Sequence, residues 1–130
     1  MRVNYVIVFV SDMKRSVAFY RDVIGLPLKF ETPDWTEFAT DGATLALHGG
    51  ERPAQGPAGG REVPAGRCRP GLSVPDLDAF HARMVERNVP CVQEPKAVFG
   101  VRVAQYLDPD GLSLSVGEAR TGITDPGRAT

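Results

Sequence analysis

Apolar and polar residues follow two periods along this chain, the two-residue period of strands and the 3.6-residue period of helices. In the first half these periods predict strands at 3–10, 28–31, 35–40 and 43–48 and a helix at 13–24. Asp12 is suited to cap the start of that helix, and Gly25 to end it. Asp41-Gly42 is a strong signal for a hairpin turn between the last two strands. Val3 to Val10 is nearly all apolar, which predicts a strand buried on both faces.

The second half of the chain repeats this order of elements. Val10-Ser11-Asp12-Met13 returns as Val74-Pro75-Asp76-Leu77, 64 positions later (74 − 10 = 64). A helix follows Asp76 and ends near Asn88. The strands expected around it are 68–74, 90–93, 101–107 and 112–116. A duplicated unit of this size is expected to pack around a pseudo-two-fold axis. We therefore predict an α+β fold in which two tandem β-α-β-β-β modules form one curved mixed sheet with outer helices.

Two segments without strong periodicity set the expected domain boundaries. Residues 49–67 hold six Gly and three Pro, and we expect them to join the modules at 1–48 and 68–117 as a passive loop or as a lid. Residues 118–130 have few apolar anchors and are expected to form a loose tail. The two modules together are expected to make one domain, residues 1–117.

Charge and composition exclude several classes of protein. The net charge is −1, from 15 basic and 16 acidic residues, so nothing favours a nucleic-acid or anionic-membrane partner. No apolar run approaches the ~20 residues that span a bilayer, and the N-terminal apolar stretch leads into a helix cap rather than a cleavage site. We therefore expect a cytoplasmic protein in which Cys68 and Cys91 are free thiols. The chain has no CxxC, HExxH or glycine-rich phosphate motif.

Strand alternation predicts which side chains face a cleft between the modules. In the first hairpin, residues whose numbers sum to 83 are expected to pair, so Trp35 opposes His48. In the second, Leu107 is expected to oppose Leu112. The resulting face is rich in aromatic side chains with a few polar groups, which is typical of a small-molecule pocket. The candidate ligand-binding residues are Tyr5, Ile7, Phe9, Trp35, Glu37, His48, Arg69, Arg102, Tyr106, Ser113 and Ser115.

Two motifs carry a resemblance to a known family. They are the segment from Phe9 to Leu26 (FVSDMKRSVAFYRDVIGL) and the turn Asp108-Pro109-Asp110-Gly111. With the duplicated plan, they resemble the vicinal oxygen chelate superfamily over about residues 1–117. This superfamily contains glyoxalase I, extradiol dioxygenases, fosfomycin resistance enzymes and bleomycin resistance proteins. The motifs are specific for the superfamily and not for one activity.

The metal enzymes of that superfamily carry four ligands, one in the first and one in the last strand of each module. On this chain the resemblance implies that the four places fall on Tyr5, Ala46, Arg69 and Ser115. Alanine has no donor and arginine is a fixed cation, so we expect no metal and no cofactor. His48 and Glu37 are two ligands without a third, which makes a poor site. The other histidine, His81, is expected to be a partly exposed helix residue.

The resemblance is nearest to the metal-free bleomycin resistance branch, which implies sequestration of a drug at a homodimer interface. We expect the aromatic residues to stack on a planar or conjugated natural product, giving antibiotic resistance by binding. Arg69 or Arg102 is expected to pair with a carboxylate or stack on a ring. The near-zero net charge argues against a polycationic ligand.

Other functions stay open at this point. A metal-independent isomerase or lyase would use His48 as general base, paired with Glu37 or a serine. A metal-dependent glyoxalase or dioxygenase, and a regulatory module without a small ligand, are the remaining alternatives.

Overall fold

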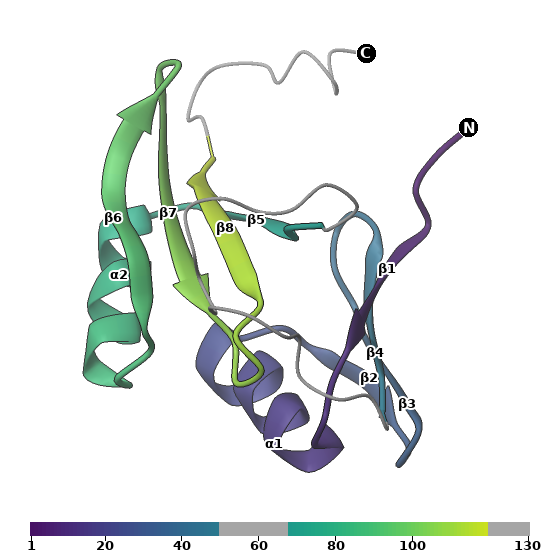
Figure 1. The fold of residues 1–130 in the computed structure, drawn as a ribbon. Coiled ribbons are helices and arrows are strands. Elements are labelled where there is room, and N and C mark those ends of the chain that lie inside the picture. The colour runs from purple at the N-terminus through teal and green to yellow at the C-terminus, as the bar shows by residue number, and fades with distance from the viewer. Residues whose placement is uncertain (50–67, 120–130) are drawn as a thin grey trace. The chain divides into compact units, whose positions relative to one another are not determined.

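Each half of the chain forms its own four-stranded mixed sheet in this computed structural model, which describes residues 1–49 and 68–119 (Figure 1). The first half contains β1 (Tyr5–Phe9), α1 (Met13–Ala18), η1 (Phe19–Ile24), β2 (Leu28–Glu31), β3 (Trp35–Phe38) and β4 (Thr44–His48). The second contains β5 (Gly71–Val74), α2 (Leu77–Glu86), β6 (Cys91–Val98), β7 (Val101–Leu107) and β8 (Ser113–Glu118). The strand orders, β1-β4-β3-β2 and β5-β8-β7-β6, are equivalent. The predicted α+β class and the two β-α-β-β-β modules are confirmed, but the strands hydrogen-bond into two sheets rather than one.

The repeated phrase marks the same structural position in both modules. Asp12 accepts a hydrogen bond from the backbone N of Arg15 at 3.1 Å, and Asp76 accepts one from Ala79 at 3.0 Å. Both aspartates have φ −140°, so each caps its helix as predicted. The equivalence extends to the parallel strand pairs, where Ile7 lies beside Ala46 and Gly71 beside Ser115. Residues 7 and 71 are again 64 apart (71 − 7 = 64).

The helix predicted at 13–24 changes form halfway. Its second part, η1, is a π-helical turn that ends at Gly25 with a left-handed φ of 99°. A π-helical turn holds more residues than an α-helical turn, so the residues that face the core shift by one position. Phe19 and Tyr20 are adjacent in sequence, and both are buried and in edge contact at 5.1 Å between ring centroids.

The turn at 108–112 belongs to the compact unit formed by residues 1–49, while the rest of the second half forms a second unit. Asp108 is only 5% exposed, and its Oδ2 accepts a 2.7 Å hydrogen bond from the Tyr20 hydroxyl. Its Oδ1 accepts from the backbone N of Asp110 and Leu112. Burial raises the pKa of Asp108 and raises that of Tyr20 as well. The family turn therefore supplies a buried carboxylate to the helix of the first unit.

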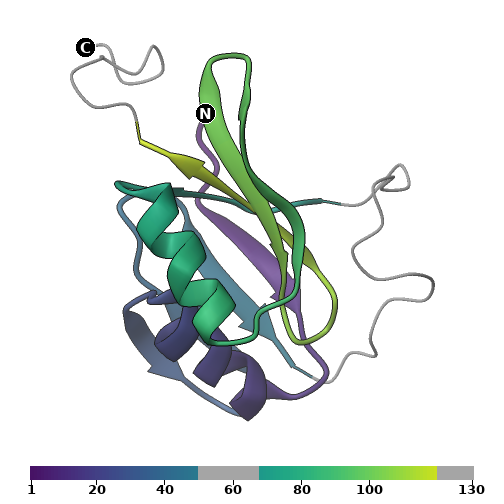
Figure 2. The ribbon, with the colours of Figure 1, turned by 90° about the vertical axis from the view of Figure 1, so that its left-hand side faces the viewer.

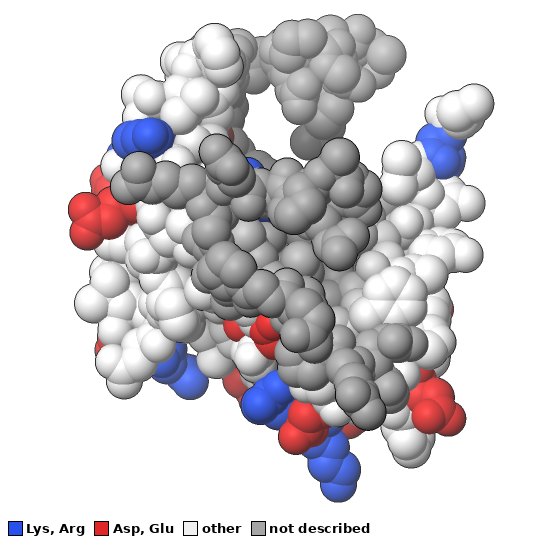
Figure 3. Space-filling model, in the orientation of Figure 1, with Lys and Arg blue, Asp and Glu red and all other residues white. Residues whose placement is uncertain are grey.

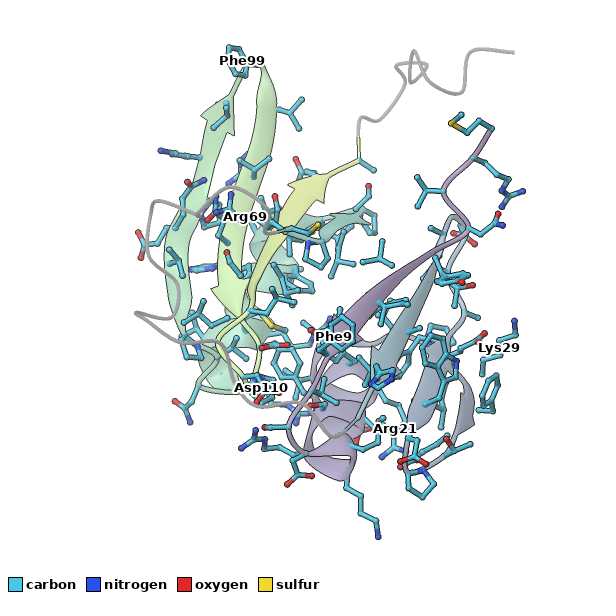
Figure 4. All side chains as sticks on the ribbon, turned by 45° about the vertical axis from the view of Figure 1, so that its right-hand side comes forward. Phe9, Arg21, Lys29, Arg69, Phe99 and Asp110 are labelled. Carbon is cyan, nitrogen blue, oxygen red and sulfur yellow. The ribbon has the colours of Figure 1, made fainter. Side chains whose placement is uncertain are left out.

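Asp110 fastens the same turn to the start of α1 (Figure 4). The backbone N of Ser11 donates to it at 3.1 Å, and the Ser11 hydroxyl donates to its other oxygen. Arg15 Nη2 lies 3.2 Å from the same carboxylate. Two segments far apart in sequence, both part of the family resemblance, are thus partners in one hydrogen-bonded cluster.

In the second unit, α2 packs on β6, β7 and β8 (Figure 2). The buried side chains between the helix and the sheet are Leu77, Phe80, Met84, Ala104, Tyr106, Leu114 and Val116. Glu118, expected in a loose tail, lies in β8 and accepts a hydrogen bond from the backbone N of Leu77 at 2.9 Å. The tail beyond Ala119 and the predicted linker after Gly49 lie outside the described residues.

The register predicted for the second hairpin is wrong by one residue. Leu107 pairs with Ser113, and Tyr106 with Leu114. Asp108 N donates to Leu112 O at 2.9 Å, so the loop has three residues rather than four. The third loop residue, Gly111, has a φ of 83°, which is the usual geometry of a three-residue hairpin connection. A shift of one residue in one strand reverses the face of its side chains.

The β6–β7 hairpin has an unfavourable residue at its tip. Phe99 and Gly100 connect Val98 to Val101 and have φ of 51° and 79°, the pattern of a type I′ turn. The Phe99 side chain is 98% exposed, so it packs on little (Figure 4).

We expect Phe99→Asn to raise the free energy of unfolding by about 0.5–1 kcal/mol, because asparagine tolerates the left-handed conformation. Urea denaturation measures the change. Phe99→Ala, which keeps a Cβ without the side-chain amide, is the matched control and should give no such gain. An equal gain in both variants would show that loss of the exposed ring, and not the turn geometry, is responsible.

Candidate ligand-binding face

One face of the first sheet is left open by the helices. The predicted register of its hairpin is confirmed, since Trp35 pairs with His48 and Glu37 with Ala46. On β1 the side chains of Tyr5, Ile7 and Phe9 are 54%, 37% and 56% exposed, whereas Val8 is buried. We call the set that shares this side the open face; it consists of Tyr5, Ile7, Phe9, Trp35, Glu37, Thr44, Ala46 and His48. The prediction that β1 is buried on both faces is therefore wrong.

Four rings on the open face form a continuous line. Tyr5 lies edge-on to Trp35 at 6.4 Å between ring centroids, Trp35 edge-on to His48 at 6.2 Å, and His48 lies 5.3 Å from Phe9. Ala46 lies between these residues in the register and is completely buried. Its small side chain leaves room for the larger rings to converge. The result is a partly exposed aromatic surface on three adjacent strands.

Two polar contacts fix the rings in place. The indole Nε1 of Trp35 donates to Glu37 Oε2 at 2.9 Å, and Lys29 Nζ lies 3.6 Å from Glu37 Oε1 (Figure 4). Nδ1 of His48 lies 3.0 Å from the carbonyl oxygen of Gly49, so this nitrogen is the donor and Nε2 is left as an acceptor. Glu37 therefore orients Trp35, and its carboxylate is not the partner of His48.

The residues at the four family ligand places do not fit a divalent cation. The equivalence of the Ile7–Ala46 and Gly71–Ser115 pairs supports the assignment of Ala46 and Ser115 to the same position in the two sheets. Ala46 has no donor atom, and Arg69 carries a fixed positive charge. Within residues 1–49 and 68–119 there is also no group of three His, Cys, Asp or Glu side chains arranged to hold a metal.

Two predicted site residues of the second sheet lie on its helix face instead. Tyr106 is buried against α2, where its hydroxyl is 2.8 Å from Nδ1 of His81. Burial raises the pKa of Tyr106 to about 12, so it stays protonated. Arg102 forms ion pairs with Asp78 at 2.8 Å and with Glu118 at 3.9 Å. The prediction that Tyr106 and Arg102 share a concave face with the serines is wrong because the hairpin register differs by one residue.

Two of the remaining candidates, Ser113 and Ser115, lie on the side of the second sheet away from α2. Ser113 and Ser115 alternate with the buried Leu114 and Val116 on β8, and Arg69 precedes β5. Gln105 pairs with Ser115 and shares that side. If the β7–β8 hairpin had been predicted with a three-residue loop, Gln105 would have been placed beside Ser115 on the side away from α2. Lys29 was also missed, because a bulge in β2 next to Phe30 interrupts the alternation there.

Solved structures with this fold include proteins of several kinds. A protein of unknown function from Agrobacterium tumefaciens is 29% identical, with a TM-score of 0.72 over 92% of this chain and 95% of that chain. TnmS3, an antibiotic binding protein from Streptomyces sp. CB03234, is 28% identical, with a TM-score of 0.69 over 92% and 97%. A lactoylglutathione lyase from Agrobacterium tumefaciens, at 21% identity and a TM-score of 0.69 over 94% and 97%, shares the fold. No curated protein matches the chain.

The family follows from a match along almost the whole sequence. The sequence model of the Glyoxalase/Bleomycin resistance protein/Dioxygenase superfamily matches residues 2–116, a range that includes both modules and the Asp108–Gly111 turn. Its extent agrees with the duplicated fold and with the structures above. The chain belongs to the glyoxalase/bleomycin resistance protein/dioxygenase superfamily.

Proposed function

We propose that this protein binds an aromatic or conjugated small molecule without a metal and sequesters it, as an antibiotic-resistance protein would. The observation that supports this most directly is the line of partly exposed rings formed by Tyr5, Trp35, His48 and Phe9 on the open face. A flat ligand would cover these rings, and each aromatic contact contributes about 0.5–1.5 kcal/mol beyond area burial. The ring of Trp35 is already oriented by Glu37, so little order is lost on binding.

The charges favour a neutral ligand over a polycation. The net charge is −1, and on the side drawn in Figure 3 positive and negative side chains are interspersed outside the grey atoms. The described helices are also too short and too polar to cross a bilayer. The 28% identity to TnmS3, an antibiotic binding protein, further supports a natural product as ligand.

A fluorescence titration tests the proposal, because Trp35 is the single tryptophan of the chain. We expect neutral 2-(hydroxymethyl)anthraquinone, a flat tricyclic probe, to quench Trp35 saturably at one ligand per chain, with the probe recovered unchanged. Calorimetry gives an independent stoichiometry. Quenching that stays linear with probe concentration, together with no heat of binding, would contradict a binding site on the open face.

Catalysis is the second candidate, and the orientation of His48 favours it. The Gly49 carbonyl holds the proton on Nδ1 and leaves Nε2 as a base on the aromatic surface. Such a base would serve an isomerase or lyase. If the protein is such an enzyme, chromatography with mass detection will show conversion of the bound probe by the wild type and none by His48→Gln. Unchanged probe with both proteins favours sequestration.

We also propose a homodimer. Apolar side chains are exposed on and before β1, at Val3, Tyr5, Ile7 and Phe9, and a second copy would close a cleft over them in which the ligand lies on the rings. Analytical ultracentrifugation at tens of micromolar should give twice the 14.0 kDa mass of one chain. Particles of monomer mass alone would contradict it.

A further inference from the structure

His48 presents a nitrogen acceptor on the open face. Its Nδ1 donates to the carbonyl oxygen of Gly49 at 3.0 Å, so the other ring nitrogen, Nε2, carries a lone pair. Within the described residues Nε2 has no hydrogen-bond partner, and it is not one of the polar atoms that are buried without one, which belong to Ser16, Arg69 and Ser113. Nε2 is therefore accessible on the partly exposed His48 side chain. A bound molecule can donate a hydrogen bond to it.

The neighbours of His48 place this acceptor among the aromatic rings. In the strand register His48 lies between Phe9 of β1 and Trp35 of β3. Its ring centroid is 5.3 Å from that of Phe9 and 6.2 Å from that of Trp35. A flat ligand that lies on these rings is thus within reach of Nε2.

The angle between the rings limits what His48 can contribute to binding. The planes of Trp35 and His48 are 89° apart. A flat molecule that stacks face to face on Trp35 is parallel to the indole and perpendicular to the imidazole, so it cannot stack on both rings. It can still meet His48 through an edge, where Nε2 can accept a hydrogen bond. His48 is therefore suited to recognise a donor at the rim of the ligand.

We propose that the open face selects a neutral phenol, whose O–H donates to Nε2 of His48 while its ring stacks on Trp35. This inference rests on the proposed function and names the class of its ligand. A phenolic O–H lies at the rim of its ring, and it is a stronger donor than an aliphatic hydroxyl because it is more acidic. The proton stays on the oxygen, so the ligand is unchanged.

A cationic donor is a poorer fit than a neutral one. The carboxylate of the open face belongs to Glu37, and it is already engaged by Trp35 Nε1 at 2.9 Å and by Lys29 Nζ at 3.6 Å. A protonated amine at His48 would have to compete with Lys29 for that charge. A phenol needs only the lone pair of Nε2.

Two probes of the same ring size test the donor. 2-Naphthol carries a phenolic O–H that stays protonated near neutral pH, and 2-methoxynaphthalene carries the same oxygen without the proton. We expect calorimetry with the full chain to give 2-naphthol an affinity about three- to tenfold higher, the size of effect that one neutral hydrogen bond produces.

Two variants show whether His48 is the acceptor. His48→Phe keeps a ring beside Phe9 and Trp35 but has no acceptor, so it should bind the two probes with equal affinity. Its affinity for 2-methoxynaphthalene should stay within about twofold of wild type, because the ring contacts remain. His81→Gln is the matched control, since it replaces the other histidine of the chain, on α2, and it should keep the wild-type preference.

A spectrum of the wild type observes the acceptor directly. The imidazole ¹H–¹⁵N spectrum contains signals from two histidines, and either variant identifies which signals belong to His48. We expect 2-naphthol to move the Nε2 signal of His48 toward that of a protonated nitrogen and to leave the His81 signals in place. 2-Methoxynaphthalene should not cause this shift. One folded variant is enough for the assignment, and the comparison of probes on the wild type requires none.

Three results would overturn the proposal. They are equal affinity of the wild type for the two probes, a preference for 2-naphthol that persists in His48→Phe, and an Nε2 signal that stays in place when 2-naphthol binds. If both probes bind without a preference, only the phenol site fails, and aromatic binding on the open face stands. If neither probe binds, the proposed function fails together with the phenol site.

Discussion

Trp35→Ala is expected to weaken binding of 2-(hydroxymethyl)anthraquinone by about 30-fold or more. Trp35 is the middle member of the ring line, in contact with Tyr5 on one side and His48 on the other. Its removal takes away the largest stacking surface and leaves both neighbours unsupported. Central aromatic residues of this kind typically contribute about 2–4 kcal/mol to binding. Calorimetry is the appropriate measurement, because the variant has no tryptophan to observe.

Three controls separate stacking from general damage. Trp35→Phe keeps a ring and should lose less than about tenfold. Glu37→Gln keeps an acceptor for the indole N–H but loses the ion pair with Lys29, so it should change affinity little. Phe99→Ala removes a fully exposed ring outside the open face and should have no effect. Affinity of Trp35→Ala within twofold of wild type would show that the ligand does not bind on these rings.

The first hairpin could be predicted because a local turn signal and the hydrophobic pattern agree. Asp41-Gly42 fixed the pairing of Trp35 with His48, and the structure has that pairing even though the strands end at Phe38 and begin again at Thr44. Side-chain alternation then assigns the open face without any tertiary information. The aromatic line is, for this reason, the part of the candidate site that sequence alone locates.

The second hairpin could not be predicted with equal certainty because its turn sequence suits two loop lengths. Asp108-Pro109-Asp110-Gly111 fits a four-residue loop, but Asp108 bonds to Leu112 and leaves three residues in the loop. This difference of one loop residue changes which side chains of β7 and β8 share a face. Tyr106 and Arg102 consequently moved from the predicted pocket to the helix face, whereas Ser113 and Ser115 remained on the other side.

The role of the Asp-Pro-Asp-Gly turn is a tertiary property. Tyr20 and Asp108 are 88 positions apart, and no local pattern connects them. From sequence the two motifs only mark a family. In the structure the same residues form a buried hydroxyl–carboxylate pair and an exposed cluster of Ser11, Arg15 and Asp110. The most family-specific residues of this chain thus serve its folding, which explains why they do not indicate an activity.

Asp108→Ala is expected to lower the free energy of unfolding by about 3 kcal/mol near neutral pH. The substitution leaves three donors without an acceptor, namely the Tyr20 hydroxyl and the backbone N–H groups of Asp110 and Leu112. Each unsatisfied buried donor costs about 1–3 kcal/mol, and partial access of water to the turn reduces the sum. Urea denaturation followed by circular dichroism measures the loss. Tyr20→Phe removes one of these hydrogen bonds and should cost less than Asp108→Ala.

Asp108→Asn tests the charge separately from the hydrogen bonds, since the amide oxygen still accepts from both backbone donors. Burial raises the pKa of Asp108 in the folded protein, so the folded state holds this proton more strongly than the unfolded state does. The stabilisation from protonated Asp108 is complete below the ordinary carboxyl pKa of 3.8 and is lost as the pH rises through the raised value. Relative to Asp108→Asn, the wild type should therefore lose stability with increasing pH across that window. A parallel pH dependence in the two proteins would mean that Asp108 titrates normally and is not desolvated by its packing against Tyr20.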